Sequence, residues 1–144
     1  MLTHRVMGLD VGDKTIGVAM SDLLGLTAQG IEVIARKNLK QDIARLRTLI
    51  EQHNVGHIVV GLPRSLNNKL GPQAEKVQEF VAYMHKSINL PSDYIDERFT
   101  TSIAERSLIE VDMSRIKRKQ IIDKVAAQII LQSYLDRMQR TSKG

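Results

Sequence analysis

The chain has 144 residues, a formal net charge of +5, 42% hydrophobic residues and no cysteine. This length is enough for one domain with a sizeable core, and the lack of cysteine excludes disulfides, thiolate metal sites and cysteine nucleophiles. No apolar run is long enough to span a bilayer, and the N-terminus has no signal-peptide pattern. We therefore expect one cytoplasmic, membrane-free domain over residues 1–138, followed by a frayed basic tail over residues 139–144.

The positive net charge favours a polyanionic partner, although solubility alone would also explain it. Aromatic residues make up 3% of the chain and tryptophan is absent. This composition argues against a protein that binds single strands by stacking bases on aromatic rings. A nucleic acid partner would therefore be held through its phosphates.

Two apolar stretches, residues 7–11 and 15–21, flank Gly12-Asp13-Lys14, which predicts an antiparallel hairpin. Because side chains alternate along strands, one face of this hairpin is apolar and the other carries small residues around Asp10. A carboxylate in so apolar a run is costly unless it is paired or binds a metal, and the glycines beside it are expected to leave room for a ligand. The alternative is that Asp10 lies at a sheet edge in contact with water. The small-residue face comprises Gly8, Asp10, Gly12, Thr15, Gly17, Ala19 and Ser21.

The remaining pattern alternates strands and helices. It predicts a strand at 30–35, a helix at 39–54, a buried strand at 57–63, a helix from Pro72, a strand at 93–99, a helix from Thr100 or Thr101, and a last helix from Gln120 to about Met138. In the helix at 39–54, Leu39, Ile43, Leu46 and Ile50 lie at helical spacing, with charged residues between them. The order indicates an α/β fold with a mixed five-stranded sheet covered by helices. Its first three strands are antiparallel, and its last two are parallel to the first.

Two further acidic elements converge on the predicted site. Asp123 shares the apolar stripe of the last helix with Ala127, an unusual position for an acid, although a salt bridge to Arg98 or Lys119 would also explain it. Asp96-Glu97 ends the last strand, and alternation points only one of the pair toward the face of Asp10.

Carboxylates brought together in this way repel one another unless cations lie between them. Mg²⁺ and Mn²⁺ prefer oxygen ligands, and two such ions about 4 Å apart can activate a water and steady the leaving oxygen of a phosphodiester. The acids therefore indicate metal-dependent phosphodiester chemistry.

Five motifs, in order along nearly the whole chain, resemble the YqgF/RuvX family: residues 8–12, residues 16–22, residues 59–63, residues 96–101 and residues 123–127. The resemblance implies a ribonuclease H-like fold and three metal-binding, catalytic acids, carried over as Asp10, Glu97 and Asp123. Asp96 is the weaker candidate. It also implies Mg²⁺ or Mn²⁺ as cofactor, with two ions.

For function, the resemblance implies a nuclease that processes the 5′ end of pre-16S rRNA. The alternative is a Holliday junction resolvase acting on four-way DNA junctions, and an alternative of another class is a non-catalytic RNA-binding factor. The partner is thus structured RNA or a DNA junction, and the protein is a monomer or a weak homodimer. The residues expected to contact nucleic acid are Lys14, Arg64, Lys69, Arg98, Arg115, Lys117, Arg118 and Lys119.

Overall fold

The computed structural model describes residues 4–63, 71–96 and 115–142. In chain order, the elements are β1 (Arg5–Val11), β2 (Thr15–Ser21), β3 (Ala28–Ala35), α1 (Leu39–His53), β4 (Val55–Leu62), α2 (Pro72–Met84), β5 (Ser92–Asp96) and α4 (Arg115–Ser142). The predicted helix from Thr100 or Thr101 lies outside the described residues. Among the described helices, none is long and apolar enough to cross a membrane.

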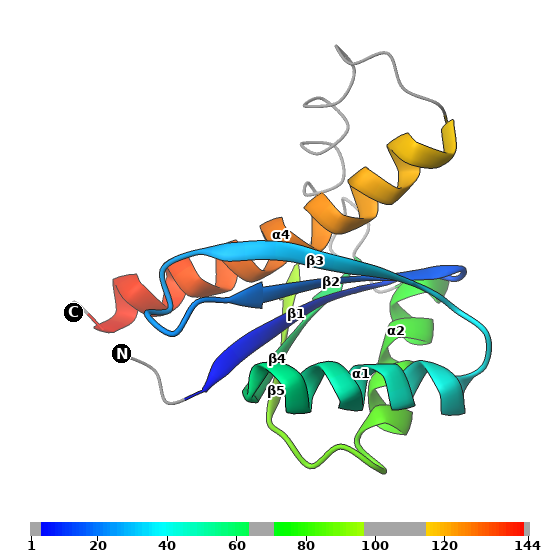
Figure 1. Cartoon of the computed structure of the whole chain (residues 1–144), viewed down its shortest axis with the longest axis horizontal. Coiled ribbons are helices and arrows are strands. Elements are labelled where there is room, and N and C mark those ends of the chain that lie inside the picture. The colour runs from blue at the N-terminus through cyan, green and yellow to red at the C-terminus, as the bar shows by residue number, and fades with distance from the viewer. Residues whose placement is uncertain (1–3, 64–70, 97–114, 143–144) are drawn as a thin grey trace.

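The strands form one five-stranded sheet in the order β3-β2-β1-β4-β5 (Figure 1). β1 pairs antiparallel with β2, and β2 pairs antiparallel with β3. β4 pairs parallel with β1, and β5 pairs parallel with β4. The predicted fold class and strand directions are therefore confirmed. The hairpin turn is also confirmed, because the Gly12 amide donates to the carbonyl of Thr15 at 2.8 Å.

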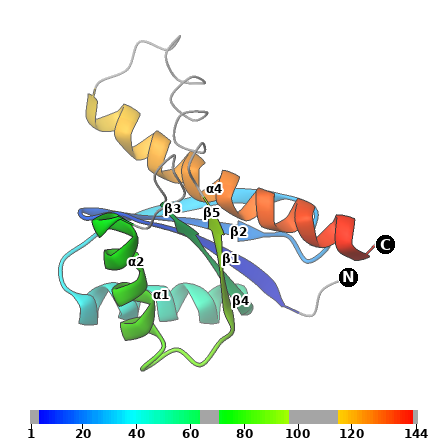
Figure 2. The ribbon, with the colours of Figure 1, turned by 180° about the vertical axis from the view of Figure 1, so that it is seen from behind.

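Helices cover both faces of the sheet, with α1 and α2 on one side and α4 on the other (Figure 2). The apolar face of the hairpin packs into the larger core under α1 and α2. The small-residue face lies under α4, in a second cluster of buried residues. The alternation predicted for the two strands is therefore confirmed. The second cluster comprises Val6, Ala19, Ala28, Val59, Ile95, Ala127, Ile130, Leu131 and Leu135.

The first helix follows the pattern with one exception. The side chain of Asn38 accepts from the Gln41 amide and caps the N-terminus, and Asn54 ends the helix in the left-handed conformation at φ 54°. Of the apolar residues at helical spacing, Leu39 is 38% exposed, whereas Ile43 and Leu46 are buried, and so is Leu49. A residue at the first position of a helix has no preceding turn to hold it against the sheet, so its periodicity predicts burial less well.

The last helix differs from the prediction at both ends. α4 begins at Arg115, five residues before the expected start, so the basic run of residues 115–119 is helical rather than a loop before the helix. At the other end the helix continues to Ser142 instead of ending near Met138. Gln132 and Gln139 donate from α4 to the carbonyls of Leu26 and Gly25, each at 2.8 Å, and hold this end to the loop after β2.

Glycines let the backbone of α4 lie directly on the sheet. A Cβ added at Gly8 would stand 2.7 Å from the Cβ of Leu131, and a Cβ at Gly17 would overlap the carbonyl oxygen of Asp123. The expectation that Gly8 leaves room for a ligand beside Asp10 is therefore wrong, because α4 fills that space.

Candidate active site

Asp10 lies one residue before the end of β1, on the face that α4 covers, and its residue is half-buried. Its partner across the antiparallel ladder is Gly17 on β2. The adjacent residues Leu9 and Val11 point to the other face of the sheet, where their packing in the core under α1 and α2 fixes the strand. Strand alternation and the buried neighbours together hold the Asp10 carboxylate at this end of the sheet.

Asp123 reaches the same corner from α4. Its backbone lies against Gly17, which is the residue directly opposite Asp10. Its carboxylate accepts a hydrogen bond from the hydroxyl of Thr15, with Oγ1 2.7 Å from Oδ2. Since Thr15 begins β2 and follows the hairpin turn, this bond joins α4 to the hairpin that carries Asp10. The two acids are thus brought together from positions 113 residues apart in the sequence.

The alternative partners of Asp123 in a salt bridge, Arg98 and the side chain of Lys119, lie outside the described residues. Among the described residues, the hydrogen bond to its carboxylate comes from a neutral hydroxyl rather than from a cation. Thr15 itself was not predicted as a site residue, although its place on the small-residue face with Asp10 was the signal that could have identified it. A hydroxyl donor fixes one carboxylate oxygen without neutralising the charge.

Asp96 lies on the other face of the sheet. Ile95 is buried under α4, so strand alternation points the exposed Asp96 away from Asp10 and Asp123. Glu97, the third predicted catalytic acid, lies outside the described residues. Within the described residues, no group of three His, Cys, Asp or Glu side chains gathers to hold a metal.

Asp10 and Asp123 nevertheless have the chemistry for a hard divalent cation. Both are carboxylates, and the charge of Asp123 has no cationic partner in the described part of the chain. Oxygen donors of this kind suit Mg²⁺ and Mn²⁺. The described residues therefore supply two candidate ligands on adjacent elements.

The predicted nucleic-acid-binding residues are only partly described. Lys14 is exposed in the hairpin turn, next to the corner that holds the acids. Arg64, Lys69 and Arg98 lie outside the described residues. The four basic residues of α4 lie on its first turns, which extend beyond the edge of the sheet in both views, and their side chains fall outside the description (Figures 1 and 2). These residues are Arg115, Lys117, Arg118 and Lys119.

A separate polar cluster joins β4, β5 and α4. The His57 Nε2 lies 2.8 Å from Asp93 Oδ2, and the His57 ring stacks on Tyr134 with centroids 5.4 Å apart. Burial raises the pKa of the Tyr134 phenol, and the negative charge of Asp93 raises it further. Because His57 pairs in register with Val6 at the start of β1, the cluster lies toward the opposite end of the sheet from Asp10.

Two solved structures share this arrangement of elements over most of the chain. The structure of Thermus thermophilus RuvC in complex with a Holliday junction substrate superposes with a TM-score of 0.58 and 14% identity, over 94% of this chain and 96% of that chain. The fowlpox virus Holliday junction resolvase gives a TM-score of 0.58 and 15% identity, over 93% of this chain and 99% of that chain. At this identity the likeness defines the fold, which is that of the ribonuclease H-like resolvases.

Sequence comparison is more specific. The family described as "RuvX: Holliday junction resolvase" matches residues 4–137. A Heliobacterium modesticaldum protein is 54% identical over 132 residues, which is 92% of this chain and 89% of the relative. A Moorella thermoacetica protein is 54% identical over 134 residues, 93% of this chain and 96% of the relative. Both carry the name "Putative pre-16S rRNA nuclease".

The chain belongs to the RuvX family. It is accordingly a nuclease, an enzyme of phosphodiester hydrolysis whose substrates are nucleic acids.

Proposed function

We propose that this chain is a metal-dependent endonuclease that processes the 5′ end of pre-16S rRNA, with Asp10, Glu97 and Asp123 as its catalytic, metal-binding acids. The observation that carries the proposal is the corner where Asp123, oriented by Thr15, lies against the strand residue opposite Asp10. The fold and the position of Asp10 and Asp123 at one corner of the sheet support the assignment.

One or two bound Mg²⁺ or Mn²⁺ ions would lower the pKa of an attacking water and stabilise charge on the leaving oxygen. Asp10 and Asp123 are the described residues that would hold such ions. The sheet fixes Asp10, and the hydroxyl of Thr15 fixes the rotation of the Asp123 carboxylate. A ligand held in this way loses little conformational entropy when it binds a cation.

Pre-16S rRNA is the favoured substrate because the relatives that are 54% identical carry that name. A four-way DNA junction is the second candidate, and the family description and the solved resolvases favour it. In cells we expect a cytoplasmic protein, a monomer or weak homodimer, whose nuclease domain spans residues 1–138. A junction resolvase that makes paired cuts should be a symmetric dimer, so the oligomeric state in solution discriminates between the substrates.

The direct test is cleavage by the purified protein. Labelled pre-16S rRNA and a synthetic four-way junction are incubated separately with Mg²⁺, Mn²⁺ or EDTA. We expect cuts near the 5′ end of the rRNA precursor with either metal and none with EDTA. Cleavage of the junction alone would assign the enzyme to DNA, and cleavage in EDTA would remove the metal from the mechanism.

The Thr15 hydroxyl gives a first prediction. Thr15→Val keeps the shape of the side chain but removes the donor to Asp123, so we expect the cleavage rate to fall about 10- to 100-fold, as for other groups that orient a metal ligand. Thr15→Ser retains the hydroxyl and should restore most of the rate. Mn²⁺ binding, followed by electron paramagnetic resonance, should weaken in the Val variant alone. Equal rates and equal Mn²⁺ affinity in both variants would mean that the hydroxyl does not orient Asp123.

The choice between the two adjacent acids of β5 gives a second prediction. Ile95 faces α4, so continued alternation predicts that residue 97 faces α4 and that Asp96 does not. Glu97→Gln should therefore abolish cleavage, and Asp96→Asn should reduce it far less. Rates of both variants are measured at saturating metal. The reverse ranking would assign the metal ligand to Asp96.

The basic start of α4 gives a third prediction. Replacing Arg115, Lys117, Arg118 and Lys119 with Ala should weaken substrate binding and flatten its dependence on log salt, by about 0.9 for every duplex phosphate that the variant no longer neutralises. Single-turnover cleavage at saturating substrate should change little. The measurement is fluorescence anisotropy with labelled RNA at several salt concentrations.

The matched control removes the same four charges elsewhere. Lys37, Lys40, Arg47 and Lys86 are all exposed and belong to the layer of α1 and α2, on the other side of the sheet. The control variant should keep the wild-type salt slope. An equal reduction of the salt slope in both variants would mean that net charge, rather than the start of α4, governs binding.

A further inference from the structure

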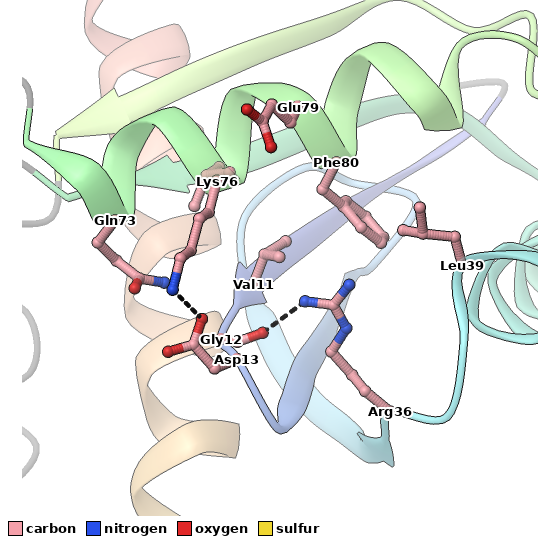
Figure 3. Close-up of a pocket in the computed structure, with 10 residues that line it drawn as sticks. Val11, Gly12, Asp13, Arg36, Leu39, Gln73, Lys76, Glu79 and Phe80 are labelled. Carbon is pink, nitrogen blue, oxygen red and sulfur yellow. Dashed lines mark hydrogen bonds and ion pairs between the residues drawn. The ribbon is translucent and has the colours of Figure 1, made fainter.

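Arg36 donates hydrogen bonds to the hairpin turn between β1 and β2. The Nη1 of Arg36 donates to the carbonyl of Gly12 at 2.7 Å (Figure 3). The backbone amide of Arg36 donates to the carbonyl of Lys14 at 2.9 Å. Side chain and backbone of one residue thus hold both neighbours of Asp13. Arg36 follows β3 directly, so this grip joins the turn to the segment that leads into α1.

Besides Gly12, the side chain of Arg36 contacts Asp42 and Phe80. Its Nε lies 3.2 Å from Oδ2 of Asp42, whose other oxygen accepts from the Lys37 amide at 3.1 Å. Its guanidinium lies 5.1 Å from the centre of the Phe80 ring on α2. Asp42 is only 2% exposed, and a carboxylate so buried requires a charged partner. The guanidinium can satisfy Asp42 and Gly12 together because its donors form a rigid planar fork.

On the side of Arg36, the described residues around the turn leave a pocket and one exposed ion pair. A pocket of about 260 Å³ lies beside it, lined by Val11, Gly12, Asp13, Arg36 and Lys76 among others. Within the described residues, the turn also makes an ion pair between Lys76 and Asp13 at 3.3 Å, in which both side chains are about 60% exposed. An exposed pair of this kind fixes geometry poorly. Among the described contacts on this side, the hydrogen bonds from Arg36 therefore hold the turn more firmly than the ion pair does.

The turn connects the two strands that build the acidic corner. Asp10 lies two residues before Gly12, and Thr15, which orients Asp123, directly follows Lys14. The Gly12 amide also donates to the Thr15 carbonyl, so Gly12 and Thr15 move as a unit. A displacement of the turn would shift the strand end of Asp10 and the hydroxyl that orients Asp123 at once.

We propose that Arg36, anchored by the buried Asp42, is a positioning residue that sets the spacing of the Asp10 and Asp123 carboxylates through the Gly12–Lys14 turn. The inference rests on the proposed nuclease function of these acids. Arg36 lies on the opposite face of the sheet from α4 and acts through the backbone of the turn, so it is not a catalytic residue.

The test is Arg36→Lys. An ammonium still neutralises Asp42, which keeps the fold, but its single nitrogen lacks the fork that serves Asp42 and Gly12 together. We expect kcat to fall about 10- to 100-fold with KM unchanged, and Mn²⁺ binding to weaken by a similar factor. The amides of Gly12 and Arg36 itself report the turn directly, and their hydrogen exchange should become at least about tenfold faster.

The matched control is Arg45→Lys on α1. Arg45 also pairs through a fork with a carboxylate, that of Glu32, and these hydrogen bonds lower the pKa of Glu32. This pair is more exposed and does not contact the hairpin turn. The control should leave kcat, Mn²⁺ affinity and exchange of the two amides at wild-type values.

Asp42→Asn serves as the second variant if Arg36→Lys does not fold at the assay temperature. It removes the charge that anchors the guanidinium and should raise the same two exchange rates. Wild-type exchange and wild-type kcat in a folded variant would overturn the inference, and so would a rise in KM alone, since that would mean substrate contact. Failure of the wild-type protein to bind Mn²⁺ or cut nucleic acid would overturn the proposed function and this inference with it.

Discussion

Replacing Asp10 with Asn is expected to lower the rate of nucleic acid cleavage about a thousandfold or more while the fold persists. In its proposed role as a metal ligand, Asp10 would contribute several kcal/mol to stabilisation of the transition state, and about 4 kcal/mol corresponds to a thousandfold. Asn keeps the size of the side chain and its hydrogen-bonding capacity but loses the charge that attracts the cation. The rate is measured with excess enzyme at saturating Mg²⁺, so that weakened substrate binding does not contribute.

The melting temperature distinguishes this effect from misfolding. Without metal, Asp10→Asn removes repulsion from the nearby Asp123, so stability should hold or rise. Asp136→Asn is a suitable control, because Asp136 is exposed on α4 and accepts a hydrogen bond from Gln132. It should change neither rate nor stability. An Asp10→Asn variant that cuts as fast as the wild type would remove Asp10 from the active site.

Gly17→Ala is expected to lower the free energy of unfolding sharply, because the added Cβ makes the shortest contact among the glycines whose surroundings are described. The new Cβ would overlap the carbonyl oxygen of Asp123, which belongs to the helix backbone and cannot rotate away. Overpacking of this kind lowers the free energy of unfolding by about 1–3 kcal/mol when side chains can move aside. Because the helix backbone cannot move aside, we expect a loss of about 3 kcal/mol or more. Thermal or denaturant unfolding measures the loss.

Cleavage should fall along with stability in this variant. Relief of the contact requires α4 to move away from β2, which carries Asp123 away from Asp10, so even the folded fraction should cut slowly. Gly71→Ala is the control, since a Cβ there meets nothing within 4 Å, and it should cost well below about 1 kcal/mol. A Gly17→Ala variant with wild-type stability would contradict the close packing of α4 on β2.

Much of the fold could be predicted because the spacing of apolar residues along the chain indicates strands and helices and the faces that they bury. Alternation in the hairpin identified the face of Asp10, and the stripe of Asp123 with Ala127 identified the buried face of the last helix, since both patterns depend on chain geometry alone. The strand directions followed from turn and crossover chemistry. The start of α4 was placed five residues too late, although Arg115 and Lys117 are good helix formers.

The contacts that complete the site could not be predicted in the same way. Thr15 and Asp123 lie 108 residues apart, and no local pattern states that they meet. Gly8 was interpreted as room for a ligand because a glycine in a strand indicates close approach without identifying what approaches. Asp42 illustrates the same limit: an acid in the first turn of a helix is typical of capping, and its burial against Arg36 depends on tertiary packing.

The position of α4 in the chain bears on when activity begins. All five strands precede this helix, so a growing polypeptide can pair its sheet before the residue that accepts from Thr15 has been synthesised. Until α4 docks, it does not cover Gly8 and Gly17, and the carboxylate of Asp123 is absent from the corner that holds Asp10. We therefore expect a nascent chain to be unable to cut nucleic acid, and hydrolysis to begin only once synthesis has passed α4.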